Sequence, residues 1–193
     1  QANGNTLDGF NLSVNSANGV SLAAILSSDL LYDVIPGIFD ADPIAGAGLG
    51  LVQANDNLGN GVAITQSGFT GAYGLLAGIE ANNNGDDGFN LLLGSGTDAF
   101  VGLIETDAAG NGDEGIELTL TAAGSALSAL VYVDVTGNVN QGVLVNQTAG
   151  TDALALLGGV DAISNGTIGI HYNLTAAGVT AACITESESM YNG

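Results

Sequence analysis

A repeat of 27 residues constrains what this chain can fold into more than any other feature of its sequence. A glycine followed by an apolar residue recurs at that interval, at Gly61, Gly88, Gly115, Gly142 and Gly169. Three further columns keep the same register: an asparagine four residues before each glycine, an aliphatic residue fifteen after it, and an acid nineteen after it. Four columns in one register indicate that the chain is built from copies of one structural unit.

The members of these columns are as follows. The asparagines are Asn57, Asn84, Asn111, Asn138, Asn165 and, opening a further copy, Asn192. The aliphatic residues are Leu76, Leu103, Leu130, Leu157 and Ile184, and the acids are Glu80, Asp107, Asp134, Asp161 and Glu188. Two imperfect copies, at Gly9 and Gly37, precede the regular ones. We therefore predict a single domain, 1–193, of seven copies: 5–32, 33–56, 57–83, 84–110, 111–137, 138–164 and 165–191.

Within a copy, apolar residues alternate after the glycine, as in Ile116-Glu117-Leu118-Thr119-Leu120. This period of two is typical of a strand. A corner of small residues follows, then a second extended stretch, then a turn built on Asn-Gly, two residues that tolerate positive φ. The pattern predicts an all-β fold, a parallel β-solenoid of about seven coils with two to three short strands per coil, stacked about 4.8 Å apart.

Residues 27 apart are expected to lie directly above one another. The asparagine column then forms a ladder of amides that are hydrogen-bonded from coil to coil; the alternative is that each Asn serves only its own turn. The aliphatic column is expected in the core, together with the inward strand positions Ile64, Leu91, Leu118, Val145 and Tyr172.

Two columns in the second stretch are harder to place. Cys183 shares a column with Leu75, Ala129 and Leu156, which favours a buried thiol over a linking disulfide. A neighbouring column is either part of the core or an outward apolar stripe for lateral packing, and the sequence leaves both readings open; it consists of Tyr73, Phe100, Leu127 and Leu154.

The chain has 20 acidic residues and no lysine or arginine, so its formal net charge is −20. Without cations it has no means of binding nucleic acid or an anionic membrane surface, and it cannot form a Schiff base or an arginine clamp. No apolar run is long enough for a transmembrane helix, so membrane insertion is not expected.

The acids are concentrated at two places. Stacked at one coil spacing, the acidic column would carry repulsions of about 0.9 kcal/mol per pair in water and about 3.5 kcal/mol at an effective dielectric of 20. Full solvation, protonation or bound divalent cations would each relieve this repulsion. A second cluster, at one corner of two adjacent coils, contains Asp86, Asp87, Asp113 and Glu114. All nine residues are candidate ligands for a calcium-type ion. No cofactor is required, and calcium is the one candidate.

Several features favour an extracellular or cell-surface location. The N-terminal Gln1 suggests a processed chain without a signal peptide, and the single cysteine cannot close an internal disulfide. Asn165 lies in a sequon, and three further sequons supply the glycosylation candidates Asn11, Asn146 and Asn173.

Together, the Gly-apolar strand starts, the Asn column and turns such as Asn84-Gly85 resemble the parallel β-helix proteins of microbial cell surfaces and extracellular filaments. The resemblance covers the whole chain but specifies an architecture rather than one family. β-Helical pectate lyases rely as a class on basic residues, which are absent here, so the resemblance does not imply that activity.

We expect a secreted structural protein, not an enzyme, that stacks head to tail with itself into a filament, sheath or surface layer. Asn192-Gly193 matches the start of another copy, and such a contact does not close on itself. The alternatives are a monomeric adhesin or a module that binds surface glycans, and a polysaccharide-active enzyme. The enzyme would use carboxylate pairs such as Asp86 with Asp113 or Asp87 with Glu114. His171 lacks partner histidines and is not expected to bind metal.

Overall fold

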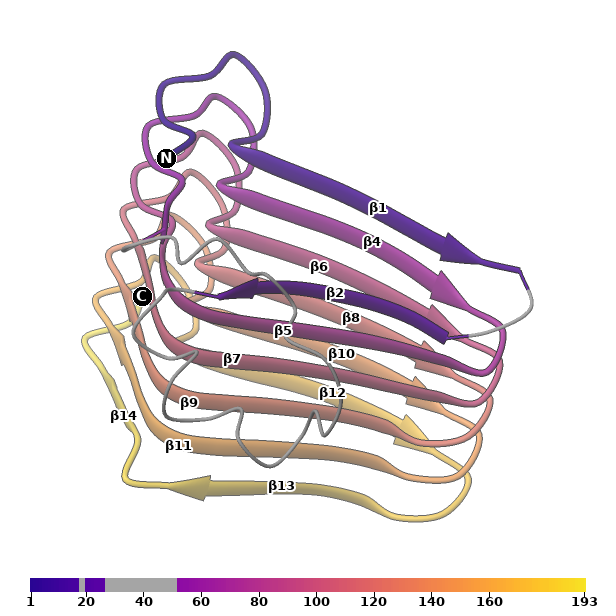
Figure 1. Cartoon of the computed structure of the whole chain (residues 1–193). Helices are drawn as coiled ribbons and strands as arrows, with labels where there is room; N and C mark the ends of the chain where they lie inside the picture. The colour runs from indigo at the N-terminus through magenta and orange to yellow at the C-terminus, as the bar shows by residue number, and fades with distance from the viewer. Residues whose placement is uncertain (18–19, 27–51) are drawn as a thin grey trace.

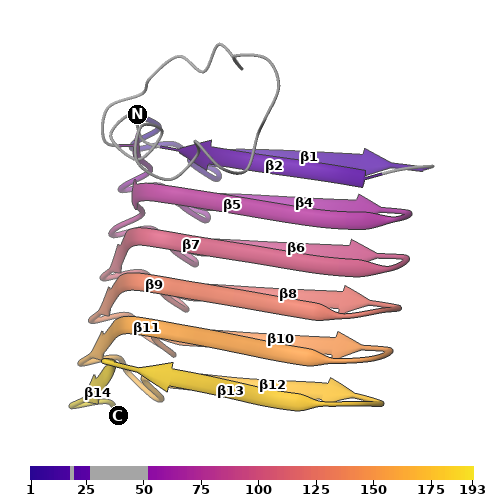
Figure 2. The ribbon, with the colours of Figure 1, turned by 60° about the horizontal axis from the view of Figure 1, so that its bottom comes forward.

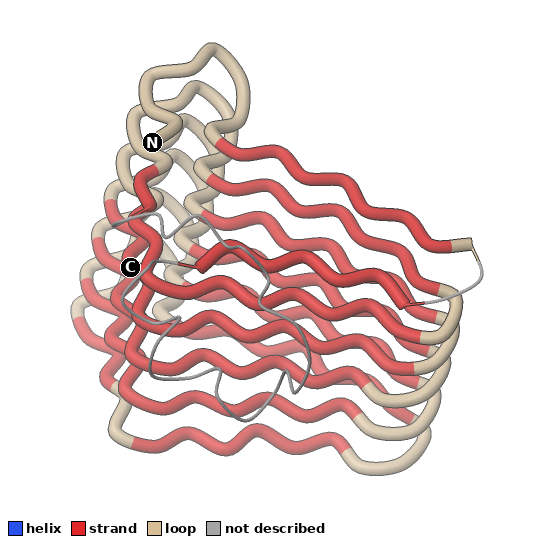
Figure 3. Tube along the Cα trace, in the orientation of Figure 1, coloured by secondary structure: helices blue, strands red, loops and turns tan. Residues whose placement is uncertain are grey.

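The computed structural model describes residues 1–17, 20–26 and 52–193 and confirms the all-β parallel solenoid (Figures 1 and 2). Strands from successive coils stack into two sheets, and the loops gather at the two edges where the chain passes between the sheets (Figure 3). Across the described ranges there is no helix long and apolar enough to cross a membrane.

The first sheet is formed by the strand that opens each coil. Its order is β1-β4-β6-β8-β10-β12, and all its pairings are parallel. Each strand begins directly after the repeat glycine, and from β4 onward partners are 27 residues apart, as Val62 is from Phe89. The strands are β1 (Phe10–Ser16), β4 (Val62–Gly68), β6 (Phe89–Ser95), β8 (Ile116–Ala122), β10 (Val143–Ala149) and β12 (Ile170–Ala176).

The second sheet is formed by the return strands, in the order β13-β11-β9-β7-β5-β2. Two short strands, β3 and β14, add to its far end by pairing with β5 and β11. The strands are β2 (Val20–Leu26), β3 (Val52–Gln53), β5 (Gly71–Glu80), β7 (Asp98–Ala109), β9 (Ala126–Thr136), β11 (Ala153–Ile163), β13 (Thr180–Thr185) and β14 (Glu188–Met190).

The repeat glycine is required by a close approach between coils. A Cβ at Gly88 would lie 2.6 Å from the carbonyl oxygen of Gly115 and 2.8 Å from Nδ2 of Asn111 in the next coil. No side chain fits in that space, so the strand can begin there only at glycine.

The core lies between the two sheets, as predicted. Leu76, Leu103, Leu130 and Leu157 are fully buried, and they face the inward side chains of the first sheet, Ile64, Leu91, Leu118 and Val145. In the β12–β13 coil the same columns are less covered: Tyr172 is half-buried and Ile184 is 54% exposed. No coil within the described residues lies against that side of them.

The predicted number of coils was wrong. β1 pairs directly with β4 at an offset of 52 residues, and Val52 and Gln53 complete the coil that β1 and β2 begin. No coil therefore lies between β1 and β4, and the first sheet has six strands among the described residues rather than seven. The predicted strand start at Gly37-Ile38 falls outside the described residues.

A bend in the return strands gives each coil a third face. At this bend one column has positive φ in coil after coil, with values between 50° and 65° at Gly78, Glu105, Tyr132, Gly159 and Glu186. Three of these residues are not glycine, so the bend holds them in a conformation that L-residues rarely adopt. The bend points the residues that follow, including the acidic column, in a new direction.

Candidate functional site

The asparagine ladder runs the length of the described stack and confirms the coil-to-coil prediction. Each Asn receives two hydrogen bonds on Oδ1, from the backbone N–H and from Nδ2 of the Asn in the preceding coil, at 2.9–3.1 Å. Asn5 donates to Asn57 in the same way, so the ladder has one more member than predicted. The members from Asn57 to Asn165 are buried, and a buried amide is stable only when bonded in this way.

The ladder has a direction, and its two ends therefore differ. All bonds between asparagines of the ladder run from the backbone N–H and Nδ2 in one coil to Oδ1 in the next coil along the chain. At the first coil, Oδ1 of Asn5 receives no hydrogen bond from the described residues. At the other end, Nδ2 of Asn192 donates to the carbonyl oxygen of Ala162 and to Oγ of Ser189. One end thus presents an acceptor without a donor among the described residues, and at the other end the Nδ2 donor is bonded to the coils before it.

The acidic column is stacked in register. Glu80, Asp107, Asp134, Asp161 and Glu188 are successive strand partners across the third face. They range from half-buried to exposed. Burial, and then the neighbouring acids Asp134 and Glu80, raises the pKa of Asp107 above its ordinary value. Burial, and then Asp161, likewise raises the pKa of Asp134. Partial solvation and a shift toward protonation both relieve the repulsion here.

Asp86, Asp87, Asp113 and Glu114 also come together and form the acidic corner. Asp87 is 3% exposed and Glu114 is 8% exposed. The two lie on adjacent coils, where the Glu114 N–H donates to Oδ1 of Asp87 at 3.0 Å. Nδ2 of Asn90 donates to the other oxygen of Asp87 at 2.7 Å. No basic residue exists in the chain to neutralise the pair.

Burial of these carboxyls changes their ionisation. Burial raises the pKa of Asp87 to about 6, against the hydrogen bonds from Asn90 and Glu114, which lower it. Burial raises the pKa of Glu114 to about 8, with the carboxyls of Asp113 and Asp87 adding to the effect. Near neutral pH, Glu114 therefore keeps its proton, and the corner carries less charge than its four acids suggest.

The acidic corner also contains the group best suited to a cation. Asp86, Asp87 and Asp113 each offer one carboxylate oxygen, and these oxygens lie within 4.8 Å of one another. Calcium binds oxygen at about 2.3–2.6 Å, so two oxygens up to about 5 Å apart can share one ion. Geometry alone does not make the corner a metal centre, and calcium binding there remains a prediction.

A second ladder escaped the sequence analysis. In the first four coils, the residue before the repeat glycine is linked to its equivalent in the next coil, whose backbone N–H donates to its side-chain oxygen. Asp8 binds Asn60, Asn60 binds Asp87, and Asp87 binds Glu114. Every residue at this position from the first coil to Gln141 carries a carboxyl or an amide. This shared side-chain chemistry could have predicted the second ladder from the sequence. The buried acids of the corner are members of this ladder.

The structure places the two uncertain columns on the outside of the second sheet. Tyr73 and Phe100 are half-buried, and Leu127 and Leu154 are 36% and 37% exposed, so they form the outward stripe and not the core. The prediction of a buried thiol was wrong: Cys183 is a free, exposed cysteine. Its side chain alternates with the inward Ile184 and therefore points outward.

The remaining candidates lie on the outer face of the first sheet. His171 is half-buried, and its Nδ1 lies 2.9 Å from Oε1 of Gln141. Asn11 and Asn173 are exposed and Asn146 is half-buried, while the sequon residue Asn165 is 2% exposed and belongs to the ladder. Glycosylation of the first three remains a prediction.

Comparisons of this chain with protein-family models, with curated proteins and with solved structures found no match. Its function is therefore argued from its own residues.

Proposed function

We propose that this protein is a structural component of an extracellular or cell-surface assembly, and that its copies stack head to tail into a filament. The observation that carries the proposal is that the two ends of the stack present complementary surfaces. β1 and β2 are the edge strands at one end, and β12 and β13 are the edge strands at the other. All the coil-to-coil pairings are parallel, so the free edge of one end fits the free edge of the other by simple translation.

The side chains at the two ends support the same contact. At the first coil, Phe10 and Val14 are half-buried and Leu12 is 36% exposed, although their columns are fully buried one coil further in. At the β12–β13 coil, Tyr172 is half-buried and Ile184 is 54% exposed. Stacking of two copies would extend one apolar core across the joint. Oδ1 of Asn5 would then take the place that Asn192 holds in the ladder and accept the bonds that Asn165 donates.

At the contact between two copies, no two members of the acidic column would face each other. In the first coil the acidic column continues as neutral Gln1 and Gln53, which are hydrogen-bonded to each other, and Gln53 donates to Glu80. With β1 and β2 of one copy against β12 and β13 of another, Glu188 would therefore meet Gln53. In the second ladder, Ile168 of one copy would meet Asp8 of the next. Such a heterologous contact does not close and generates a filament.

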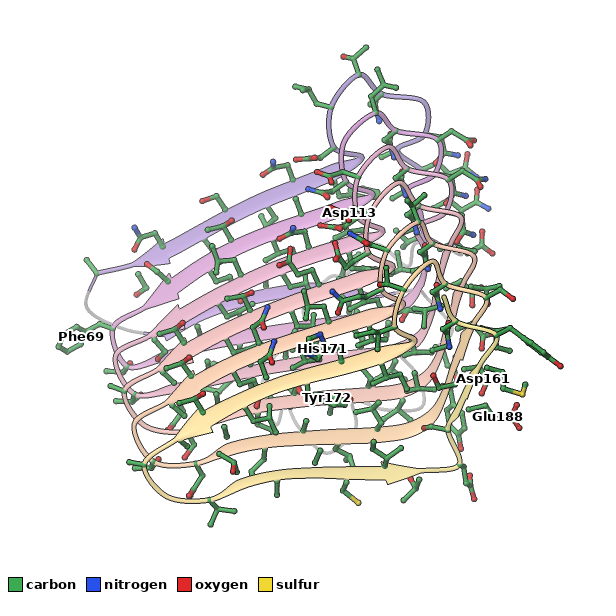
Figure 4. All side chains as sticks on the ribbon, turned by 180° about the vertical axis from the view of Figure 1, so that it is seen from behind. Phe69, Asp113, Asp161, His171, Tyr172 and Glu188 are labelled. Carbon is green, nitrogen blue, oxygen red and sulfur yellow. The ribbon has the colours of Figure 1, made fainter. Side chains whose placement is uncertain are left out.

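The two alternatives have less support. A depression at the end of the first sheet is lined by nine residues from Asn15 to Gly96, none of them a carboxylate. Phe69, at this depression, lies at the opposite end of the strands from Asp113, Asp161 and Glu188 (Figure 4). A glycosidase needs its carboxyl pair beside the substrate groove. An adhesin that stays monomeric would make no use of the match between the two end surfaces.

Mixing two end variants tests the proposal. Leu12→Asp places a charge in the first-coil end, and Ile184→Asp places one in the opposite end. Each variant alone should form no filaments, while wild type forms filaments visible by negative-stain microscopy. An equimolar mixture should form end-to-end dimers that sediment faster than either variant alone and do not grow into filaments, because each variant keeps one intact end.

Leu92→Asp is the matched control, because Leu92 is 45% exposed on the outer face of the first sheet, away from both ends. It should still form filaments, and circular dichroism should show that all three variants are folded. Wild-type protein that stays monomeric at its highest soluble concentration would overturn the proposal. So would a mixture of the two end variants that yields no dimer.

A further inference from the structure

The outer face of the second sheet is apolar across all the coils whose side chains are described. Three outward columns cover it between the small-residue corner and the bend. From β5 to β13 their residues are Tyr73, Leu75, Ala77, Phe100, Gly102, Ile104, Leu127, Ala129, Val131, Leu154, Leu156, Gly158, Ala181, Cys183 and Thr185. Ala77 and Gly102 are buried, and the others are half-buried or exposed. None is charged, in a chain that carries 20 acids. We call this surface the apolar face.

The first sheet provides an internal comparison. Its outward positions carry mainly polar side chains, such as Thr65, Asn90, Glu117, Asn146 and Thr175. Both sheets have the same strand pairing and the same repeat, so the difference lies in what each outer face meets. Parallel sheets are generally covered on both faces, and their strands are then apolar on both sides. The apolar face has this property, and the first sheet does not.

We propose that the apolar face packs against the apolar face of a second copy of this chain, related by a two-fold axis. The charge distribution points to this occupant. A basic partner would be drawn to the acidic column and the acidic corner, which lie outside this face. A second copy carries the same −20 charge and can approach closely only through a surface that bears none.

The dimensions of the face suit such a pairing. Seven residues along a strand span about 23 Å, and five or six strands at about 4.8 Å span about 24–29 Å. Two flat faces of this size bury about 1,100–1,300 Å² in total, which reaches the range of specific interfaces. Leu127, Leu154 and Leu156, each 36–43% exposed, supply the side chains that would interdigitate. Facing sheets pack about 10 Å apart, as in a β-sandwich.

This lateral contact does not depend on head-to-tail stacking, since it uses neither end of the coil stack. Within a filament, however, the same face would recur in every copy along one side. Two filaments would then associate through many weak contacts at once, with an avidity well above that of one pair. The proposal therefore predicts paired filaments rather than single ones.

The experiment uses the Leu12→Asp variant, in which the end contact is blocked. Sedimentation of this variant should show a monomer–dimer equilibrium. Adding Leu154→Asp or Leu156→Asp should weaken the dimer at least tenfold. Adding Leu92→Asp, a leucine of similar exposure on the other sheet, should leave the dimer unchanged. If wild type itself does not form filaments, the same comparison is made without Leu12→Asp.

Cys183 gives a second readout, because it lies on the apolar face and is the only cysteine in the chain. Its rate of reaction with a maleimide should fall as protein concentration rises and dimers form, but not in the Leu154→Asp variant. A folded protein that remains monomeric throughout, with a constant rate at Cys183, would overturn the proposal. So would monomers that bind neutral lipid vesicles through Leu154, because the face would then serve a lipid surface.

Discussion

Single residues in this fold are constrained by the copies above and below them rather than by their neighbours in sequence. Asn111 is fully buried and exchanges its side-chain hydrogen bonds with Asn84 and Asn138. Serine or aspartate could serve a single turn about as well as asparagine. Only a side chain with both an amide donor and a carbonyl acceptor can continue a ladder in both directions.

Replacing Asn111 with alanine should therefore be costly. Asn111→Ala leaves two donors of Asn84 unpaired in the interior, at about 1–3 kcal/mol per unsatisfied group, and removes one of the two hydrogen bonds to Oδ1 of Asn138. We expect the free energy of unfolding, measured in urea, to fall by about 3 kcal/mol or more. Asn146→Ala, on the outer face of the first sheet, should cost less than about 1 kcal/mol. Equal losses for the two variants would show that the ladder adds no stability.

Two adjacent glycines offer a sharper comparison. Gly159 has a φ of +62°, and a Cβ there would lie 2.8 Å from Cδ1 of Tyr132. A Cβ at Gly158 would meet only Oγ1 of Thr185, at 3.6 Å, and the equivalent residues in other coils are Ala77, Ile104 and Val131.

Gly159→Ala should lower the free energy of unfolding by about 1–2 kcal/mol, because alanine is strained at positive φ. Gly158→Ala should leave it unchanged or raise it slightly, because alanine restricts the unfolded chain. Thermal unfolding of the pair, followed by circular dichroism, makes this comparison. A larger loss at Gly158 would mean that the bend is not where the structure places it.

At the scale of a structural element, the acidic corner links stability to pH. The pKa of Asp87 is raised to about 6 and that of Glu114 to about 8, so the folded state holds protons that the unfolded chain releases. Their stabilising effect is complete below the unfolded values, near pH 4, and is lost as the pH rises through the folded values.

We therefore expect the Tm to fall as the pH rises from about 4 to about 8, by a few degrees for each kcal/mol lost. Glu114→Gln removes the largest shift and should flatten this fall. Glu105→Gln, the same change at an exposed acid, should not. A Tm that rises toward pH 8 in the absence of divalent cations would contradict the assignment of buried protonated carboxyls.

Calcium should act on the same element in the opposite direction. An ion bound by Asp86, Asp87 and Asp113 would stabilise their ionised forms and raise the Tm. The increase should be larger at pH 8 than at pH 5, where protons compete for the same oxygens. Asp113→Asn should reduce the effect, and Asp8→Asn, at the first coil, should not. No change in Tm on chelation at neutral pH would rule out the site.

The elements that repeat could be predicted from the sequence. The prediction failed where the repeat is interrupted, and the sequence did not determine which way side chains point beyond the corner. A solenoid converts a sequence period into a spatial ladder, so the core leucines and the asparagines could be placed from spacing alone. The number of coils was predicted wrongly because a two-residue pattern such as Gly37-Ile38 carries no information about which strands pair. The outward positions of Cys183 and Leu154 depend on strand phase beyond the corner, and the number of corner residues does not determine that phase.

For the whole molecule, the dominant quantity is the net charge of −20. Copies that join end to end or face to face must overcome mutual repulsion, which salt screens. The Debye length falls from about 30 Å at 0.01 M to about 8 Å at 0.15 M ionic strength. We therefore expect sodium chloride, with a chelator present, to increase the assembled mass measured by light scattering. Assembly that dissolves as salt is added would show that charge attraction holds the copies together.

The direction of the hydrogen bonds has a mechanical consequence. The backbone bonds between coils point along the axis of the stack, so tension applied along that axis loads every bond between two adjacent coils together. The same force passes through every step, and the step with the fewest bonds breaks first. Rupture should therefore begin where a coil has the shortest strands against its neighbour, as at β13 and β14 against β11. Under tension, such a stack would therefore lose coils from one end while the coils in its middle stay folded.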